Sequence, residues 1–148
     1  MSEYEFTISL RIRHPSIEPA TITQTLGIEP QHTWKAGDPR RDTAGEPLQR
    51  AYRESYWTGR LMEEPQLSSD QVSVESVLLQ LLAQLRRSLQ FFARLNTEGA
   101  LSELHISIFA RQDFRLELMA ESLVLLGRLG LAVTLEVHPH PHSAAPEN

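Results

Sequence analysis

The feature that most constrains the fold is a strict alternation of apolar and polar residues from Tyr4 to Arg13. One side would carry Tyr4, Phe6, Ile8, Leu10 and Ile12, and the other Glu5, Thr7, Ser9, Arg11 and Arg13. The pattern returns in Leu101–Ala110 and Leu131–Val137. Period two with a polar second side is typical of a strand with one buried face. These three segments predict a sheet that is covered on one face and open on the other.

Helical patterns separate these strands. Apolar residues recur every three or four positions between Val74 and Phe92, which predicts a helix lying on the sheet. A shorter helix is predicted from Ser16 to Leu26, ending at Gly27, and another from Arg115 to Arg128, using Leu116, Met119, Ala120, Leu123 and Leu126. We therefore expect an α+β two-layer sandwich with a mostly antiparallel or mixed sheet and its helices packed on one face. Residues 1–138 would form a single domain, and residues 139–148 a disordered tail rich in His and Pro.

Composition excludes several classes of function. The chain has 148 residues, a net charge of -5 and no cysteine, so disulfides, thiol nucleophiles and cysteine zinc sites are impossible. The acidic balance argues against a nucleic-acid partner. The N-terminus lacks the pattern of a signal peptide, and charged residues interrupt the apolar stretch 72–95. We therefore expect a cytoplasmic protein with no membrane partner.

No sequence motif assigns a catalytic residue or a cofactor. The common nucleotide-binding, zinc-protease and serine-hydrolase patterns are absent from the sequence. The tract His138-Pro139-His140-Pro141-His142 could hold a metal ion weakly, but it lacks ordered carboxylate partners. We therefore predict no dedicated metal site.

The segment 28–49 fits no helix or strand pattern and is predicted to be a long loop, with at most a short strand near Thr33–Lys35. Strand composition resumes in Ala51–Leu61. On one interpretation, Trp34 and Trp57 anchor the loop against the sheet. On the other, the two tryptophans line a ligand cleft together with Tyr52 and Tyr56, and its candidate binding residues are Trp34, Lys35, Asp38, Arg40, Arg41 and Trp57.

Three features in this region carry a family resemblance. They are the Leu26-Gly27-Ile28-x-Pro30 turn, the Trp34-x-x-Gly37-Asp38 run and the tryptophan at position 57. In these features, and in the amphipathic helix of its second half, the chain resembles a family of bacterial proteins classified only as a domain of unknown function. The likeness spans roughly Phe6 to Val137 and assigns no activity to any residue.

A non-catalytic binding or protein-interaction module is the function expected first, with an immunity-like or regulatory protein as one form of it. Its partner would be another protein, or a second copy meeting the open sheet face, where Phe109 stands in an otherwise polar register. The alternative is a small domain or enzyme that binds an anionic or aromatic ligand through the Trp34–Arg41 loop.

Overall fold

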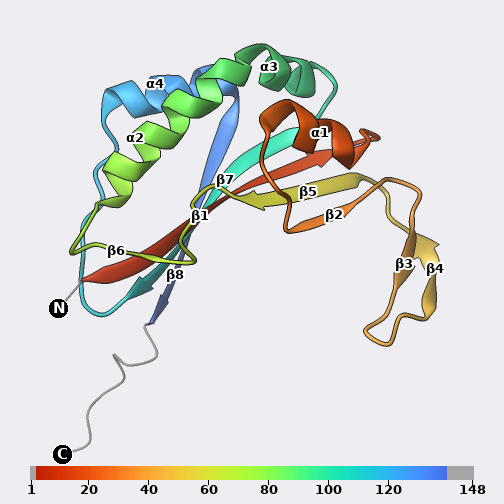
Figure 1. Ribbon diagram of the computed structural model, residues 1–148, viewed down its shortest axis with the longest axis horizontal. Helices are drawn as coiled ribbons and strands as arrows, with labels where there is room; N and C mark the ends of the chain where they lie inside the picture. The colour runs from red at the N-terminus through yellow and green to blue at the C-terminus, as the bar shows by residue number, and fades with distance from the viewer. Residues whose placement is uncertain (1–2, 140–148) are drawn as a thin grey trace, which may run out of the picture.

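The computed structural model describes residues 3–139 and shows an α+β fold with a mixed sheet (Figure 1). The sheet has the order β2-β5-β1-β7-β8, and the short β6 pairs with β1. Its strands are β1 (Tyr4–His14), β2 (His32–Trp34), β5 (Ser55–Arg60), β6 (Leu67–Ser68), β7 (Leu101–Ala110) and β8 (Leu131–Pro139). A separate hairpin consists of β3 (Pro39–Arg41) and β4 (Pro47–Ala51). The predicted fold class is confirmed.

The alternation of apolar and polar residues in β1 buries one face of the strand, as predicted. Phe6, Ile8, Leu10 and Ile12 have no exposed surface, whereas the residues between them are half-buried or exposed. β1 runs antiparallel to both β5 and β7, and β7 runs parallel to β8. The apolar face of β1 therefore lies at the centre of the core, with strands on both sides.

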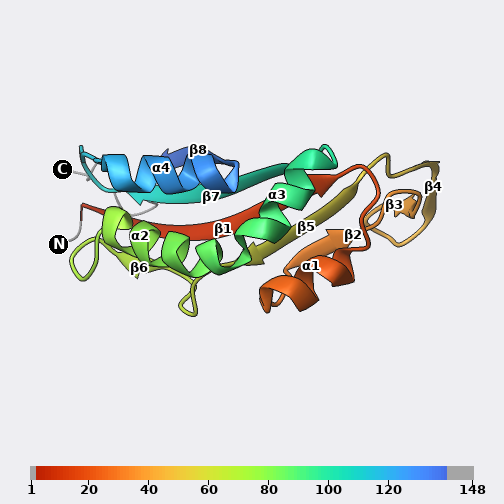
Figure 2. The same cartoon turned by 90° about the horizontal axis from the view of Figure 1, so that it is seen from above.

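The helices cover one face of the sheet (Figure 2). They are α1 (Pro19–Leu26), α2 (Val74–Leu85), α3 (Leu89–Thr97) and α4 (Ala120–Leu129), with a 3₁₀ turn, η1 (Arg86–Ser88), joining α2 to α3. The Ser73 hydroxyl caps α2 by accepting a hydrogen bond from the Ser76 N–H at 3.1 Å. Leu78, Leu82 and Phe92 of the predicted apolar stripe are fully buried. None of the helices within residues 3–139 is long and apolar enough to cross a membrane.

The last helix differs from its prediction in both length and orientation. It begins at Ala120 and not at Arg115, because residues 114–119 form an extended segment whose alternate side chains pack against the core. The helix buries Ser122, Leu126 and Leu129, whereas Met119 and Leu123 are 60% and 52% exposed. The predicted apolar face was therefore wrong at Met119, Ala120 and Leu123, which are exposed, and Leu116 lies outside the helix.

A buried histidine fixes the turn between β1 and α1. His14 Nδ1 accepts hydrogen bonds from the backbone N–H groups of Ser16 and Ile17, at 2.9 and 2.8 Å. Because Nδ1 is an acceptor, the ring proton lies on Nε2, which donates to Glu98 Oε1 at 2.7 Å. Helix α1 starts at Pro19, after Glu18 as its N-cap, because proline suits the first helical position, where its missing N–H is not needed. Ser16, the predicted N-cap, lies in the turn before it.

This contact predicts acid sensitivity. Hydrogen bonds from Arg94 and from His14 lower the pKa of Glu98 below its ordinary value of 4.5. A carboxyl whose pKa is lowered by folding stabilises the fold above its unfolded pKa, and that contribution is lost as the pH falls through the folded value. Urea midpoints of wild type and Glu98→Gln should therefore differ at pH 7, and the difference should shrink as the pH falls below 4.5. A difference that stays constant down to pH 3 would contradict this role for Glu98.

Candidate functional site

The Trp34-x-x-Gly37-Asp38 run forms a closed turn. Asp38 Oδ2 accepts a hydrogen bond from the Lys35 N–H at 3.0 Å, and the Asp38 N–H donates to the Lys35 carbonyl at 2.9 Å. Gly37 has a φ of 92°, a backbone conformation that favours glycine. The glycine and aspartate of the run therefore have a structural explanation in shaping this turn.

The same turn attaches the hairpin to the sheet. The Gly37 N–H donates to the Tyr52 carbonyl at 2.9 Å, and the Tyr52 N–H donates to the Asp38 carbonyl at 3.0 Å. Beyond this point, every residue of β3 and β4 is exposed. Figure 1 shows the hairpin projecting away from the sheet. We call residues 39–51 the arm.

The tip of the arm is ordered by its own hydrogen bonds. Asp42 Oδ1 accepts from the N–H groups of Ala44 and Glu46, both at 2.9 Å, and Arg41 Nη1 donates to the Gly45 carbonyl at 3.0 Å. The sequence predicts a loop for this segment, whereas the structure has the hairpin of β3 and β4. The turn residues Asp42 and Gly45, between Pro39 and Pro47, were the available signal.

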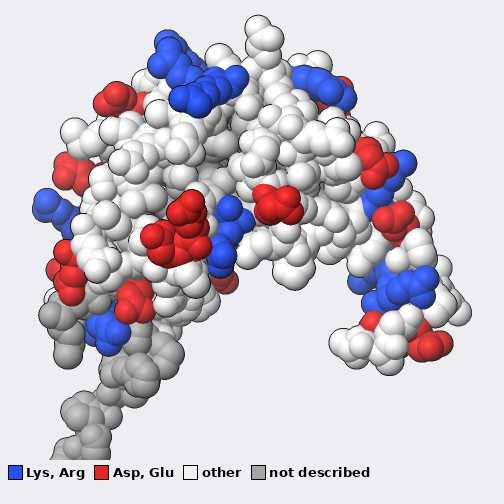
Figure 3. All heavy atoms as spheres, viewed as in Figure 1, with Lys and Arg blue, Asp and Glu red and all other residues white. Residues whose placement is uncertain are grey.

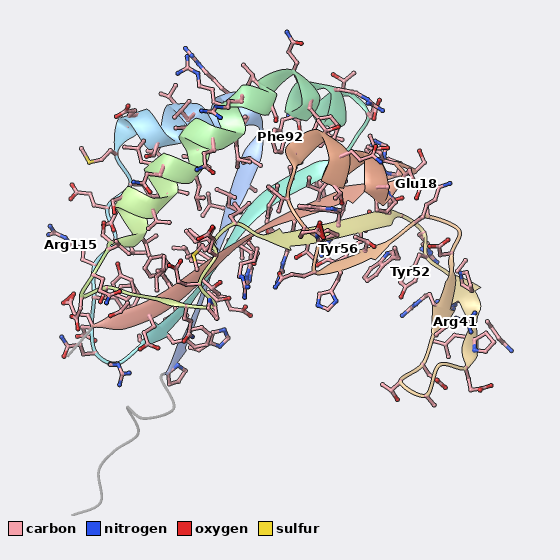
Figure 4. The ribbon with its side chains drawn as sticks, viewed as in Figure 1. Glu18, Arg41, Tyr52, Tyr56, Phe92 and Arg115 are labelled. Carbon is pink, nitrogen blue, oxygen red and sulfur yellow. The ribbon has the colours of Figure 1, made fainter. Side chains whose placement is uncertain are left out.

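An aromatic stack lies at the base of the arm. The ring of Trp34 stacks on Tyr52 at 4.2 Å and on Tyr56 at 4.5 Å between centroids. The Arg40 guanidinium lies 5.7 Å from the centroid of the Tyr52 ring. Figure 4 shows Tyr52 where the arm leaves the sheet, Tyr56 on β5, and Arg41 farther out on the arm. The rings of Trp34, Tyr52 and Tyr56 thus connect the arm to the open face of the sheet.

The strand register extends this stack across the open face. Trp34 is paired with Tyr56, Tyr56 with Arg13, and Arg13 with Leu101. These four residues form a row over β2, β5, β1 and β7, and we call them the cross-strand row. Leu101 is 68% exposed, the largest exposed fraction among the big apolar side chains of residues 3–139. Figure 3 shows the molecule as an arch, hollowed on this side between the arm and the far end of the sheet.

Charge is unevenly distributed. The strands β1 to β5 carry the arginines 11, 13, 40, 41, 50 and 60 but a single acid, Glu5. Glu5 is itself paired with Arg111 at 3.3 Å. The chain as a whole is acidic, with a net charge of -5. The strands of the arm and of the neighbouring half of the open face are therefore rich in arginine on an acidic protein, while the turn of the arm carries the acids Asp42 and Glu46.

The other half of the open face is internally paired. His105 Nε2 lies 3.0 Å from Glu136 Oε1, and the Thr134 hydroxyl donates to Glu103. Phe109 stacks on the ring of His138, with centroids 5.3 Å apart. The groups of β7 and β8 thus interact with one another across the parallel pair.

The residues predicted from the sequence to bind a ligand do not form one cluster. Trp34, Lys35 and Asp38 line a cavity of about 460 Å³ between α1 and β2, where Lys35 Nζ is 3.5 Å from Glu18 Oε2. Arg40 and Arg41 do not line this cavity and lie on the arm.

Trp57 lies apart from the cavity, in the core. It is fully buried, and its Nε1 donates to Thr23 Oγ1 at 2.9 Å. The acidic residues Glu18, Glu29 and Asp38 also line the cavity, and their negative charges do not favour an anion. The small-ligand alternative therefore stays a prediction.

Within residues 3–139 there is no group of three or more His, Asp or Glu side chains placed to hold a metal ion. His140 and His142 of the histidine tract lie outside the described residues, as does the predicted tail apart from Pro139, which ends β8. No metal chemistry is derived from the described part of the chain.

The profile of DUF4279, a domain of unknown function, matches residues 3–140, nearly the whole chain. The chain belongs to the DUF4279 family. Neither a curated protein nor a solved structure shows significant similarity to it. The predicted resemblance to a domain family of unknown function is thereby confirmed. For this DUF4279 domain, any function has to be argued from its own geometry.

Proposed function

We propose that this DUF4279 domain is a non-catalytic module that binds another protein in the hollow between the arm and the open sheet face. The observation that carries the proposal is the cross-strand row of Trp34, Tyr56, Arg13 and Leu101 beside a projecting arm. Tryptophan, tyrosine and arginine are the residue types that dominate the energetics of protein interfaces. Immunity-like and regulatory proteins, which sequester a partner, are included in this class.

The arm supports the proposal because nothing in the described fold requires it. An isolated two-stranded hairpin is marginally stable in water, and all residues of β3 and β4 are exposed. The Tyr52 backbone bonds and the stack on Trp34 hold its base in place, so the arm has a defined direction. A preorganised projection loses less conformational entropy when it contacts a partner.

The charge of this side indicates the chemistry of the partner. Arg13, Arg40 and Arg50 belong to a group of strands that carries six arginines and one acid. Complementary potentials increase association rates and select the correct partner. We therefore propose a partner protein that presents an acidic surface with an apolar centre, since Leu101 offers an exposed apolar contact.

Site-specific photocrosslinking in the native cell tests the proposal. A benzophenone amino acid replaces Leu101 in the cross-strand row, and the matched control places it at Leu79, a 37% exposed leucine of α2. We expect a protein adduct from position 101 and none from position 79. Arg13→Glu should reduce the adduct at least about tenfold, since like charges facing each other cost several kcal/mol and each 1.4 kcal/mol is a factor of about ten.

Three results would contradict the proposal. They are equal adducts from both positions, no adduct from position 101, or an adduct that nuclease removes. The last of these would indicate a nucleic-acid partner.

A further inference from the structure

Within residues 3–139, β8 is an edge strand whose outer side has no strand partner. It is paired with β7 alone among the described residues, and it ends the order β2-β5-β1-β7-β8 (Figure 2). Edge strands are usually protected by being short, or by charges, bulges or prolines. β8 is 9 residues long, has one acid at Glu136, and has its proline only at its last position. Its free N–H and C=O groups could therefore pair with another strand.

Exposed apolar side chains follow the same edge. Leu135 and Val137 lie in register with Ile106 and Ile108 on the helix-covered face, yet they are 48% and 53% exposed. Ile106 and Ile108 are fully buried, so the helices cover β7 and leave the outer part of β8 open.

Helix α4 adds two further apolar side chains to this edge. Val124 and Leu125 line a groove together with Arg86 of η1, so this flank of α4 faces α2 and η1. Met119 is the extended N-cap residue just before α4, and at 3.6 residues per turn Leu123 lies on the flank opposite this groove, toward β8. They are 60% and 52% exposed. The four side chains Met119, Leu123, Leu135 and Val137 form what we call the edge strip.

The sequence of β8 matches itself when it is paired antiparallel about Leu135. On the helix-covered face Leu135 meets Leu135 of a second copy, Val133 meets Val137, and Leu131 meets Pro139. On the open face Thr134 meets Glu136 and Ala132 meets His138. Every apolar side chain of the covered face faces another apolar one, and no two charged side chains stand directly opposite each other.

We propose that two copies of this chain form a two-fold dimer through antiparallel pairing of their β8 strands, centred on Leu135. One sheet then continues through both copies, and the two edge strips cover each other under neighbouring α4 helices. The two-fold axis makes the interface isologous, so one self-complementary edge is sufficient. This dimer uses the opposite edge of the sheet from the arm and leaves the open face free for another protein.

Single cysteines test both the dimer and its register, because the chain contains no cysteine of its own. Residues directly opposite in an antiparallel pair have Cα atoms about 4.5–5.5 Å apart, within the range that a disulfide spans. Residue 135 faces itself, so Leu135→Cys should form a covalent dimer under mild oxidation. Residue 137 faces 133, which separates the two copies of Val137→Cys by about 13 Å, beyond disulfide reach.

The expected result is at least about tenfold more cross-linked dimer for Leu135→Cys than for Val137→Cys, because only the first pair meets the geometry of a disulfide. The two sites are matched in strand, face and exposure. Equal cross-linking of both variants would overturn the register.

Sedimentation of the full chain tests the dimer without cysteines. The molar mass of the wild type determined by sedimentation should be twice the 16.8 kDa of one chain. Leu135→Glu should be monomeric, because it brings two carboxylates together at the axis. A mixture of Leu135→Glu with Leu135→Lys should regain the dimer, which also shows that each variant folds.

Leu101→Glu on the open face is the control and should remain dimeric. A monomeric wild type at about 100 µM, a concentration at which an interface of ordinary size is occupied, would overturn the proposal. Dissociation by Leu101→Glu, and not by Leu135→Glu, would overturn it as well, by placing the dimer on the open face.

Discussion

Replacing Trp57 with alanine should destabilise the domain by about 3–5 kcal/mol, the range found when a large buried aromatic side chain is removed. Trp57 is fully buried on the covered face of β5, paired with Ile12 of the central strand. Its Nε1 also donates to Thr23 Oγ1 of α1 at 2.9 Å, so the substitution leaves a cavity and removes a link between helix and sheet. Urea unfolding followed by circular dichroism measures the loss.

Trp34→Ala is the matched control for this prediction. Trp34 is half-buried and stacks on Tyr52 and Tyr56 outside the core, so its loss should cost about 1 kcal/mol, the order found for aromatic pairs. Trp57→Phe should fall between the two, because it keeps most of the buried ring but not the hydrogen bond. Equal losses for the two alanine variants would mean that Trp57 does not anchor the core.

The two tryptophans show what the sequence could and could not predict about the candidate site. From the sequence, each tryptophan could either anchor the loop against the sheet or line a ligand cleft, because a tryptophan suits both roles. The two tryptophans differ in the face of the sheet on which their side chains lie. Trp57 falls on the same face as Ile12, whereas Trp34 pairs with Tyr56 on the opposite face, which also carries Arg13 and Leu101. That distinction depends on the pairing of β2 with β5, which one sequence does not reveal.

The alternating strands were predictable because burial on one face leaves a period-two pattern. The arm left no such pattern. Both faces of β3 and β4 are exposed, so polar and charged residues occupy consecutive positions and the segment was interpreted as a loop. For the same reason the cross-strand row was not predicted as a unit. Its members come from four strands, and only the register brings them together.

In α4 and β8 the error is the reverse: an apolar pattern predicted burial for side chains that are exposed. Leu123 and Leu135 fit a helix stripe and an alternating strand, and both were expected to face the core. They are 52% and 48% exposed, because β8 is the outermost strand and no further element covers it within residues 3–139. Local periodicity shows which side chains share a face, but strand order decides whether that face is covered.

Gly59→Ala should be the second most destabilising of these substitutions, at about 2–3 kcal/mol, the upper part of the range for overpacking a core. Gly59 pairs with Leu10 of β1 on the covered face. A Cβ at this position would lie 2.6 Å from Cη2 and 3.1 Å from Cζ2 of Trp57, and 3.0 Å from Cγ2 of Ile28. The indole is enclosed on all sides, so it cannot move away without displacing neighbouring side chains.

A double-mutant cycle identifies the cause. Trp57→Phe removes the two indole carbons that the new Cβ would approach, so Gly59→Ala should cost about 1–2 kcal/mol less in that background, the size of coupling seen for residues in contact. Gly127→Ala is the control, since a Cβ there meets nothing within 4 Å. In a helix this change should stabilise by about 0.5–1 kcal/mol. Strict additivity in the cycle would show that Gly59 is required for a reason other than the close approach of Trp57.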